Sequence, residues 1–344
     1  MTTLHKERYE QLVVDVLTKG GLSQEQAEAA AEVMGYADQR GIESHGLILL
    51  KTYIERIKQK IIVGNPAYKW DLHLPNVAVL DGASGMGHFM GKIAMEEAIK
   101  KAKEHTIGLV FVKNTSHYGA SGYYTELAAK HGMIGFSTTN TFPLMAPTGG
   151  AERVLGNNPI SFSVPRENEN PIILDIATSV VAAGKLLVAE SKNETIPEGW
   201  AIDKNGQPTT DPHAGYLGGG SLLPMASHKG YGLALVMDVL AGVLAGSGYG
   251  TKVGHSTIGY VMMAINVNHI MPEQEFYARV EDLTGMVQSS RKAVGTEKIY
   301  LPGELEYVKQ ADREENGFKL SEKLYAEIEY LAEELGLDVA QYFR

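Results

Sequence analysis

The sequence predicts an α/β protein in which a sheet is covered by helices. Between about residues 77 and 266, short apolar runs alternate with helical segments, which is typical of such a layer. The N-terminal sixty residues and the segments 271–290 and 321–335 instead show the spacing of amphipathic helices. The 344 residues suffice for about two domains of about 150 residues each.

The N-terminal sixty residues predict three helices. An apolar stripe forms the first, which Gly20-Gly21 ends. Ser23, followed three residues later by Gln26, has the pattern of a capping box and predicts the start of the second. The third begins near His45. The pattern changes at Gly64-Asn65-Pro66, which we take as the first domain boundary.

The middle of the chain predicts the elements of the sheet layer. We expect helices over residues 92–103 and 123–130. We expect strands over residues 77–80, 109–112, 133–137, 160–164, 172–174 and 260–266, of which the last completes a mixed sheet. The longest apolar stretch, residues 231–246, contains Asp238 and is shorter than the about 20 residues that span a bilayer. It predicts a buried helix, and we expect no membrane partner.

Composition excludes several classes of function. Lys plus Arg number 31 against 41 Asp plus Glu, and there is no basic tract, so nucleic acid is not an expected partner. The absence of cysteine excludes disulfides, cysteine nucleophiles and thiolate metal sites. No His, Asp and Glu spacing forms a recognisable ligand set, so we expect no metal. The N-terminus lacks the apolar stretch of a signal peptide, which predicts the cytoplasm.

A glycine cluster at residues 82–87 follows a predicted strand and precedes a helix. Its glycines are not in the order G-x-G-x-x-G, and no acidic residue follows about 20 positions later on a second strand. The cluster is therefore interpreted as a strand-to-helix turn. A Rossmann nucleotide site is not supported.

The first candidate site residues lie at the start of the third helix. His45, Leu49 and Tyr53 are spaced by four, which predicts one shared helical face. Histidine can give and take a proton near neutral pH, and a phenol can hold a substrate oxygen or share that proton. The alternative is that Ser44 and His45 belong to an ordinary capped helix end.

A second histidine follows an apolar strand. His117 lies in the small polar loop after the strand 109–112. In open α/β sheets, ligand-binding groups gather on the loops that leave the carboxyl ends of strands. The alternative is a histidine in a surface turn.

Six motifs recur in order and together resemble a known family. They are Ser44-His45-Gly46 with Tyr53, Asn114-x-x-His117, Pro143-x-x-x-Pro147-x-Gly149-Gly150, Gly156-x-Asn158-Pro159, Asp175-Ile176-Ala177-Thr178 and His228-Lys229-Gly230-Tyr231-Gly232. From about residue 5 to about residue 335, the chain resembles the malate/L-lactate dehydrogenase family, which is distinct from the Rossmann lactate and malate dehydrogenases. Ureidoglycolate dehydrogenases, diketogulonate reductases, sulfolactate dehydrogenases and cyclic-imine reductases are also members.

The resemblance implies a fold and an assembly. It implies a mixed-sheet NAD(P)-binding domain of non-Rossmann type over residues 67–305, which also binds substrate. A mainly helical, discontinuous outer domain would comprise residues 1–66 and 306–344, with the C-terminal segment packed on the N-terminal helices. It also implies a homodimer, with each active site between domains and close to the subunit contact.

The activity that the resemblance implies is hydride transfer between NAD or NADP, with NAD preferred, and C2 of a small 2-hydroxy or 2-oxo acid. His117 and His45 would flank the reacting oxygen. We prefer His117 as the acid and base, with Ser44, His45 and Tyr53 orienting substrate and cofactor. The reverse assignment of the two histidines stays open.

The resemblance also places the cofactor contacts. Asp175 can accept hydrogen bonds from ribose hydroxyls, Lys229 suits the pyrophosphate, and Thr141 would lie near the nicotinamide and substrate. Taken singly, such residues are also typical of strand ends, solvated surfaces and turns. The full set is Thr141, Asn158, Asp175, Ile176, Ala177, His228, Lys229, Gly303, Glu304 and Leu305.

Two positions depart from the family pattern. Many relatives have an arginine at the position of Leu49, where its fork would bind the substrate carboxylate. Either another cation serves, such as Lys51 or one from a partner subunit, or the substrate is more apolar than malate. Phe142 stands where ureidoglycolate dehydrogenases tend to have a polar or acidic group. The two apolar walls favour a 2-oxo acid with an apolar tail.

Three alternatives remain open at this point. The chain can be a ureidoglycolate dehydrogenase or a cyclic-imine reductase on the same scaffold, because a fold does not determine a substrate. It can also be a non-catalytic paralogue that binds a nucleotide.

Overall fold

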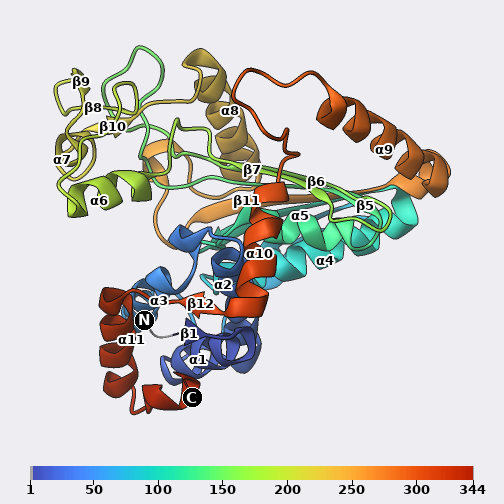
Figure 1. Cartoon of the computed structure of the whole chain (residues 1–344). Coiled ribbons are helices and arrows are strands. Elements are labelled where there is room, and N and C mark those ends of the chain that lie inside the picture. Colours follow the sequence, from blue (N-terminus) through green and yellow to red (C-terminus); the bar gives the residue numbers. More distant parts are fainter. Residues whose placement is uncertain (1–2, 344) are drawn as a thin grey trace.

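The central layer of the molecule is a seven-stranded mixed sheet, seen in Figure 1 in the computed structural model, which describes residues 3–343. The strand order is β2-β3-β4-β11-β5-β6-β7. Only β3 and β4 run parallel, and all other neighbours are antiparallel. The strands are β2 Lys69–His73, β3 Val77–Asp81, β4 Ile107–Thr115, β5 Met133–Thr139, β6 Ile160–Val164, β7 Ile172–Ile176 and β11 Ile258–Asn266. The predicted mixed sheet of non-Rossmann type is confirmed.

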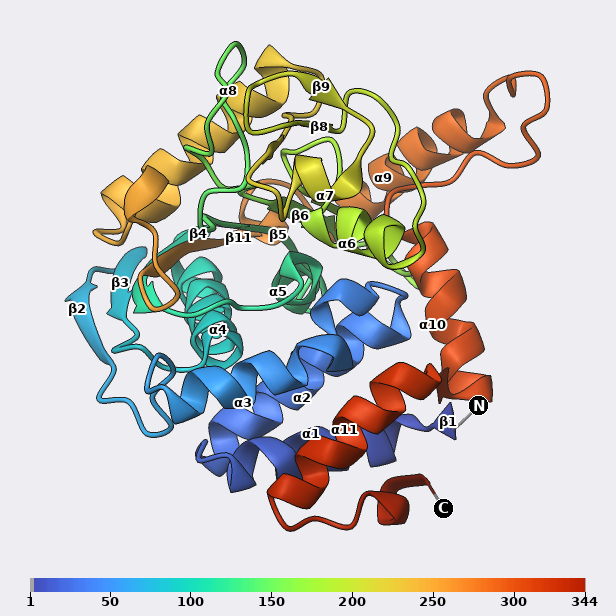
Figure 2. The ribbon, with the colours of Figure 1, turned by 90° about the vertical axis from the view of Figure 1, so that its left-hand side faces the viewer.

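Helices cover the two faces of the sheet unequally. Figure 2 shows α4 (Gly87–His105) and α5 (Ser121–Ala129) between the sheet and the N-terminal helices. On the opposite face lie α8 (His228–Asp238) and the π-helical turn Val239–Leu244. Because successive strand residues point to opposite faces, Val110 packs in the core that includes α4, whereas Phe111 packs with the π-helical turn.

The prediction of a buried helix over residues 231–246 is wrong. The helix forms, but much of its apolar surface has nothing from this chain against it. Side chains that are 38–60% exposed follow its outer side, at Leu233, Leu235, Val236, Val239, Val243 and Leu244. Helix α9 (Glu273–Ser289) is similar, since Thr284 is its one buried residue. An exposed apolar surface of this extent indicates an interaction surface.

A helical group lies on the far side of α4 and α5 from the sheet. Helices α1 (Lys6–Lys19), α2 (Gln24–Gln39), α3 (Leu50–Lys58) and α11 (Glu322–Glu334) share one apolar core with the turn Val339–Phe343. The short strands β1 (Thr3–Leu4) and β12 (Phe318–Lys319) pair, so the first and last described segments of the chain lie in this group (Figure 1). The C-terminal segment thus packs on the N-terminal helices. The domain limits at residues 66 and 305 stay a prediction.

A smaller lobe lies beside the β6 and β7 end of the sheet. It contains a three-stranded sheet of order β10-β8-β9 and its own apolar core. Its elements are α6 Ala183–Ser191, β8 Ala201–Ile202, β9 Pro208–Thr209, α7 Pro212–Gly215 and β10 Ser221–Leu222. In the part of the chain that the structure describes, no helix is both long and apolar enough to cross a membrane.

The helix start predicted at Ser23 is confirmed, since Ser23 is the N-cap of α2, but the hydrogen bonds of a capping box do not form. The Ser23 side chain caps no backbone N–H of α2. The Gln26 amide donates to the Gly64 carbonyl at 2.5 Å and to the Ser23 hydroxyl at 3.4 Å, and its oxygen accepts from the Met86 N–H at 2.7 Å. Gln26 is 1% exposed. It therefore joins the start of α2 to the loop before the sheet and to the start of α4.

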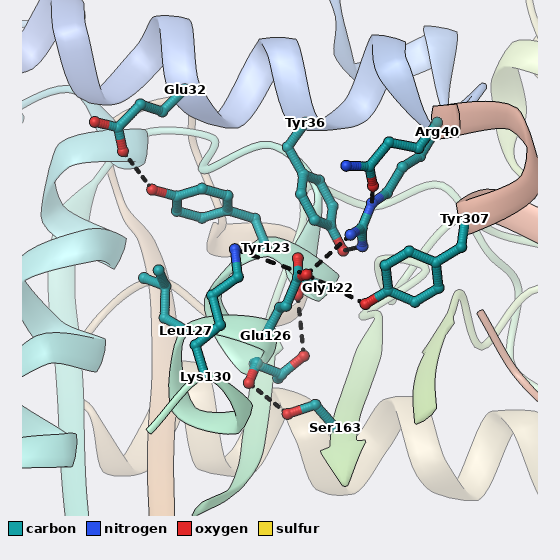
Figure 3. A network of polar contacts seen from close by, with 12 residues as sticks. Glu32, Tyr36, Arg40, Gly122, Tyr123, Glu126, Leu127, Lys130, Ser163 and Tyr307 are labelled. Carbon is teal, nitrogen blue, oxygen red and sulfur yellow. Dashed lines mark hydrogen bonds and ion pairs between the residues drawn. The ribbon is translucent and has the colours of Figure 1, made fainter. Parts of the chain in front are cut away.

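A buried ion pair holds the helical group on the sheet layer. Figure 3 shows Arg40, at the end of α2, reaching Glu126 of α5 at 2.9 Å. The two side chains are 4% and 6% exposed. The guanidinium lies between two rings, 4.0 Å from the Tyr36 centroid and 4.3 Å from that of Tyr307, on α10 (Glu304–Asn316). The Tyr307 hydroxyl also donates to Glu126 at 3.2 Å. One cluster therefore joins α2, α5 and α10.

Arg40→Met is expected to lower the free energy of unfolding by about 3–5 kcal/mol, because the buried Glu126 carboxylate then keeps only the exposed Lys130, at 3.7 Å, as a cation. The double variant Arg40→Met/Glu126→Met should recover part of this loss, since no unpaired charge remains. Denaturant unfolding of both variants measures this.

The exposed pair Lys58–Glu334, whose side chains are 46% and 47% exposed, provides the control. Lys58→Met should change the unfolding free energy by less than about 1 kcal/mol. If Arg40→Met has an equally small effect, the Arg40–Glu126 pair does not hold the two layers together.

Candidate active site

The segment that carries His45 is not the first turn of α3. Glu43–His45 and Leu47–Leu49 form two 3₁₀ turns that are separated at Gly46, and α3 begins only at Leu50. The prediction that His45, Leu49 and Tyr53 share one helical face is therefore wrong. Leu49 packs against the core of the helical group.

A buried carboxylate causes this break. The Asp38 carboxylate is 1% exposed and accepts from the Leu47 N–H at 2.8 Å and from the Tyr9 hydroxyl at 2.6 Å. A Cβ atom at Gly46 would lie about 2.0 Å from this carboxylate. Only glycine at position 46 therefore lets the backbone run this close to Asp38. Asp38 thus determines where the backbone after His45 runs.

Despite the break, the structure brings the predicted histidines and tyrosine together. The Tyr53 hydroxyl is 2.8 Å from His117 Nδ1, and Tyr53 is 1% exposed. The His45 ring lies 5.4 Å from the His117 ring, between centroids, at 30°. Ser44 Oγ is 2.9 Å from His45 Nδ1. The helical group supplies one side of this cluster, and the loop after β4 supplies His117.

Sequence reasoning missed a third histidine in the cluster. His88, the second residue of α4, is 0% exposed. Its ring is perpendicular to Tyr53 at 5.1 Å between centroids and lies 6.3 Å from the His117 ring. It follows the glycine cluster, whose turn geometry was the only feature recognised there. No spacing in the sequence relates it to Tyr53 or His117.

Burial keeps all three imidazoles neutral at pH 7. It lowers the pKa of His45 to about 4. Burial, then the neighbouring His45, lowers the pKa of His88 to about 3. The pKa of His117 is held well below its usual value by burial and then by His45, His88 and Arg56. Among the residues described, no three His, Asp or Glu side chains are arranged to hold a metal ion.

Arg56 places one positive charge near this cluster. It follows Tyr53 by three residues on α3, and in residues 3–343 its guanidinium makes no hydrogen bond or ion pair. Its charge contributes to the lowered pKa of His255, after burial. The rings of Phe142 and His255 meet edge to face at 5.3 Å between centroids. The i, i+3 spacing of Arg56 from Tyr53 is the sequence signal that places the two side chains on neighbouring positions of α3.

The three segments predicted to bind a cofactor gather around β7. The Ile173 N–H donates to the Pro302 carbonyl at 3.0 Å, so the turn at Gly303 (φ +86°) lies directly on β7. Beyond the strand, the Thr178 carbonyl accepts from the Met225 N–H at 2.9 Å. A Cβ atom at Gly230 would lie 2.5 Å from that same carbonyl. The start of α8 therefore packs tightly on the end of β7.

The acidic residues of these segments are already engaged. Asp175 Oδ2 accepts from the Gly122 N–H at 2.7 Å, and burial raises the pKa of Asp175 to about 6. Glu304 forms an ion pair with Lys298 and accepts from the Leu301 N–H at 2.9 Å. Ile176 ends β7 and Ala177 follows it. Leu305 is 49% exposed.

His228 and Lys229 are exposed at the start of α8. The two residues before them, Ala226 (φ 47°) and Ser227 (φ 55°), are non-glycine residues in left-handed conformations. Such conformations cost about 1–3 kcal/mol each and cluster at functional sites. The surrounding backbone therefore holds this turn in a strained shape.

Asn158 supports its neighbours rather than presenting a free amide. It is 0% exposed, its Oδ1 accepts from the Thr141 N–H at 3.0 Å, and its Nδ2 donates to the Ala234 carbonyl of α8 at 2.9 Å. The Thr141 hydroxyl donates to Asn157 Oδ1 at 3.0 Å. Asn158 thus connects Thr141 to α8.

The sequence and the fold match one family. The family model described as malate/L-lactate dehydrogenase matches residues 4–329. A malate dehydrogenase of Pyrococcus abyssi is 41% identical, over 96% of this chain and 94% of that protein. The ureidoglycolate dehydrogenase (NAD(+)) of Escherichia coli K12 is 36% identical, over 94% of this chain and 93% of that protein.

The solved structures agree with the sequence matches. The sulfolactate dehydrogenase from Methanocaldococcus jannaschii has a TM-score of 0.93 to this chain at 40% identity, over 99% of this chain and 100% of that one. The match in fold therefore extends over both the sheet layer and the helical group. The chain belongs to the malate/L-lactate dehydrogenase family.

Proposed function

We propose that this protein is an oxidoreductase that transfers a hydride between a nicotinamide dinucleotide and C2 of a small 2-hydroxy or 2-oxo acid. The observation that carries the proposal is the Tyr53–His117 hydrogen bond of 2.8 Å, with a second imidazole, that of His45, beside it. Family membership supports the reaction class, since relatives at about 40% identity are dehydrogenases of malate and sulfolactate.

His117 is the proton carrier of this mechanism. In the oxidative direction, the mechanism uses the neutral His117 tautomer that has its proton on Nδ1 and donates to the Tyr53 oxygen, which leaves the Nε2 lone pair free to take the hydroxyl proton of the substrate. In the reductive direction, the imidazolium returns that proton to the oxygen that becomes an alkoxide. The bound nicotinamide accepts or supplies the hydride.

His45 and Ser44 have an orienting role. The contact between Ser44 Oγ and His45 Nδ1 holds the His45 ring, and the Asp38 contacts hold the backbone on its other side. The two rings are also too close to be charged together, so only one imidazole of the pair carries a proton at a time. His117 has the phenol partner that proton transfer requires.

Arg56 is the cation that holds the substrate carboxylate. Leu49 cannot do so, Lys51 is exposed, and a partly buried guanidinium without a partner in the described residues is suited to a carboxylate. Neutralising Arg56 also removes a charge that lowers the pKa of His117. Binding of the acid therefore raises the pKa of His117 toward neutrality, where proton transfer is most efficient.

The segments around β7 hold the dinucleotide. Lys229 binds the pyrophosphate, and Asp175 accepts from a ribose hydroxyl through Oδ1, which the described residues leave without a partner. Thr141, supported by Asn158, orients the nicotinamide. Asp175 brings a negative charge to this region that would repel a ribose phosphate, so NAD is preferred over NADP.

Phe142 favours an acid with an apolar tail. Its ring packs on two apolar clusters and on His255, so it offers no polar group to a substrate. A ureidoglycolate dehydrogenase is the first alternative, because one relative has that activity at 36% identity. A cyclic-imine reductase on this scaffold is the second. A non-catalytic paralogue would have no use for the Tyr53–His117 bond.

The protein acts as a homodimer in the cytoplasm. The exposed apolar side chains of α8 and its π-helical turn form a surface suited to a second copy of the chain. Sedimentation that gives a monomer at micromolar concentration would contradict the dimer.

Oxidation of NADH and NADPH, followed at 340 nm, tests the proposed reaction. The panel comprises oxaloacetate, pyruvate, branched and aromatic 2-oxo acids, oxalurate and a cyclic imine. Turnover is expected with a 2-oxo acid, fastest with an apolar tail, and with a lower KM for NADH than for NADPH. If nucleotide binds but no compound turns over, the paralogue interpretation replaces this one.

His117→Asn is expected to lower kcat by about 10²–10⁴-fold and to remove the dependence of kcat on a group that titrates near neutrality. His45→Asn should mainly raise KM and keep that dependence. Equal, mild losses in the two variants would contradict the assignment of His117.

Arg56→Met is expected to raise KM for the 2-oxo acid by about 30-fold or more, because a carboxylate then loses a charged partner. KM for the cofactor should stay within about twofold. Arg56→Lys should recover little, since an ammonium lacks the planar fork. Lys51→Met is the matched control on α3, and an equal effect from it would exclude Arg56 as the anchor.

A further inference from the structure

In residues 3–343, His88 is the one buried side chain whose polar atoms have no hydrogen-bond partner. Among the residues that the structure describes, the buried side-chain nitrogen and oxygen atoms without a hydrogen bond are its Nδ1 and Nε2, and no others. Native proteins pair nearly all such atoms, because an unpaired buried group loses its hydration without compensation. An exception at one position requires a reason.

Protonation does not give the His88 imidazole a partner. Burial and the neighbouring His45 lower the pKa of His88 to about 3, so the ring stays neutral. Apolar side chains fill the core at neighbouring positions, since Met90 and Met95 of the same helix are both 0% exposed. A methionine of similar volume would leave nothing unpaired at position 88. Packing alone therefore favours a different residue.

The position of His88 supplies the reason. Its ring stands perpendicular to Tyr53 at 5.1 Å and lies 6.3 Å from the His117 ring. The ring also meets Gly119 (φ +79°), where a Cβ atom would lie 2.9 Å from His88 Nε2. Gly119 follows His117 in the same loop. His88 therefore supports both partners of the Tyr53–His117 hydrogen bond.

We infer that His88 is a positioning residue for the hydroxy-acid reaction, which holds Tyr53 and His117 and offers its uncommitted ring nitrogens to the charge that forms on that pair during turnover. The inference rests on the proposed function. A polar group can lack partners in the resting protein and interact with charge that develops during the reaction. Such a group stabilises the transition state more than the ground state. His88 therefore lowers the stability of the protein and raises its kcat.

His88→Met tests the inference, because the two effects have opposite signs. The unfolding temperature of the cofactor-free variant is expected to rise by about 1–4 °C, since two unpaired polar atoms are removed. Its kcat should fall by about tenfold or more, and KM for acid and cofactor should change less than about threefold. The group that titrates in the kcat profile should shift in pH, because it belongs to the Tyr53–His117 pair.

Two further variants separate position from chemistry. Met95→Leu, a buried change of nearly constant volume in the same helix, should leave both kcat and the kcat profile unchanged. His88→Gln keeps a polar side chain and should recover part of the lost kcat.

Several outcomes would overturn the inference. If His88→Met raises the unfolding temperature with kcat unchanged, or lowers it or fails to fold, His88 is a packing residue. If wild-type protein turns over no acid in the panel, the proposed function fails instead. The wild-type assay therefore distinguishes the two failures.

Discussion

The buried pair of Arg40 and Glu126 is the contact on which the arrangement of the molecule most depends. Each charge is buried and has the other as its nearest opposite charge, so separating α2 from α5 would leave both poorly compensated. The rings of Tyr36 and Tyr307 extend this constraint to α10. His45 and Tyr53 come from the helical group and His117 from the sheet layer. The geometry of the candidate site therefore requires that the two layers stay in register.

The electrostatics of the site follow from the same burial. His88 is fully buried and His45 and His117 are partly buried, and this burial keeps the three imidazoles neutral, while one guanidinium nearby has no partner in the described part of the chain. Without a bound ligand, the site therefore binds a proton weakly. An anionic ligand reverses the balance, because it neutralises Arg56 and favours a protonated His117. Binding and proton transfer are thereby coupled through charge alone.

Sequence reasoning predicted the α/β class, most strands and the set His45, Tyr53 and His117, because period-two patterns and short motifs are local signals. It failed where distant residues decide local structure. Asp38 breaks the helix after His45, the Gln26 oxygen accepts from the Met86 N–H while the Ser23 N–H donates to Gly64, and α8 leaves much of its apolar surface exposed. His88 was missed because its importance comes only from what surrounds it. The family resemblance supplied the discontinuous helical group.

The place of β11 in the sheet has a consequence for how the chain is made. β11 lies between β4 and β5 and pairs with both, yet it comes from residues 258–266, long after β5 ends at residue 139. A ribosome adds about 5–20 residues per second, so β11 is synthesised on the order of 10 s after β5. During that time the edges of β4 and β5 that pair with β11 are unpaired. Until then, two apolar strands present open edges that other chains can join. Nascent copies of this protein should therefore need protection by a chaperone while the middle third of the sequence is translated.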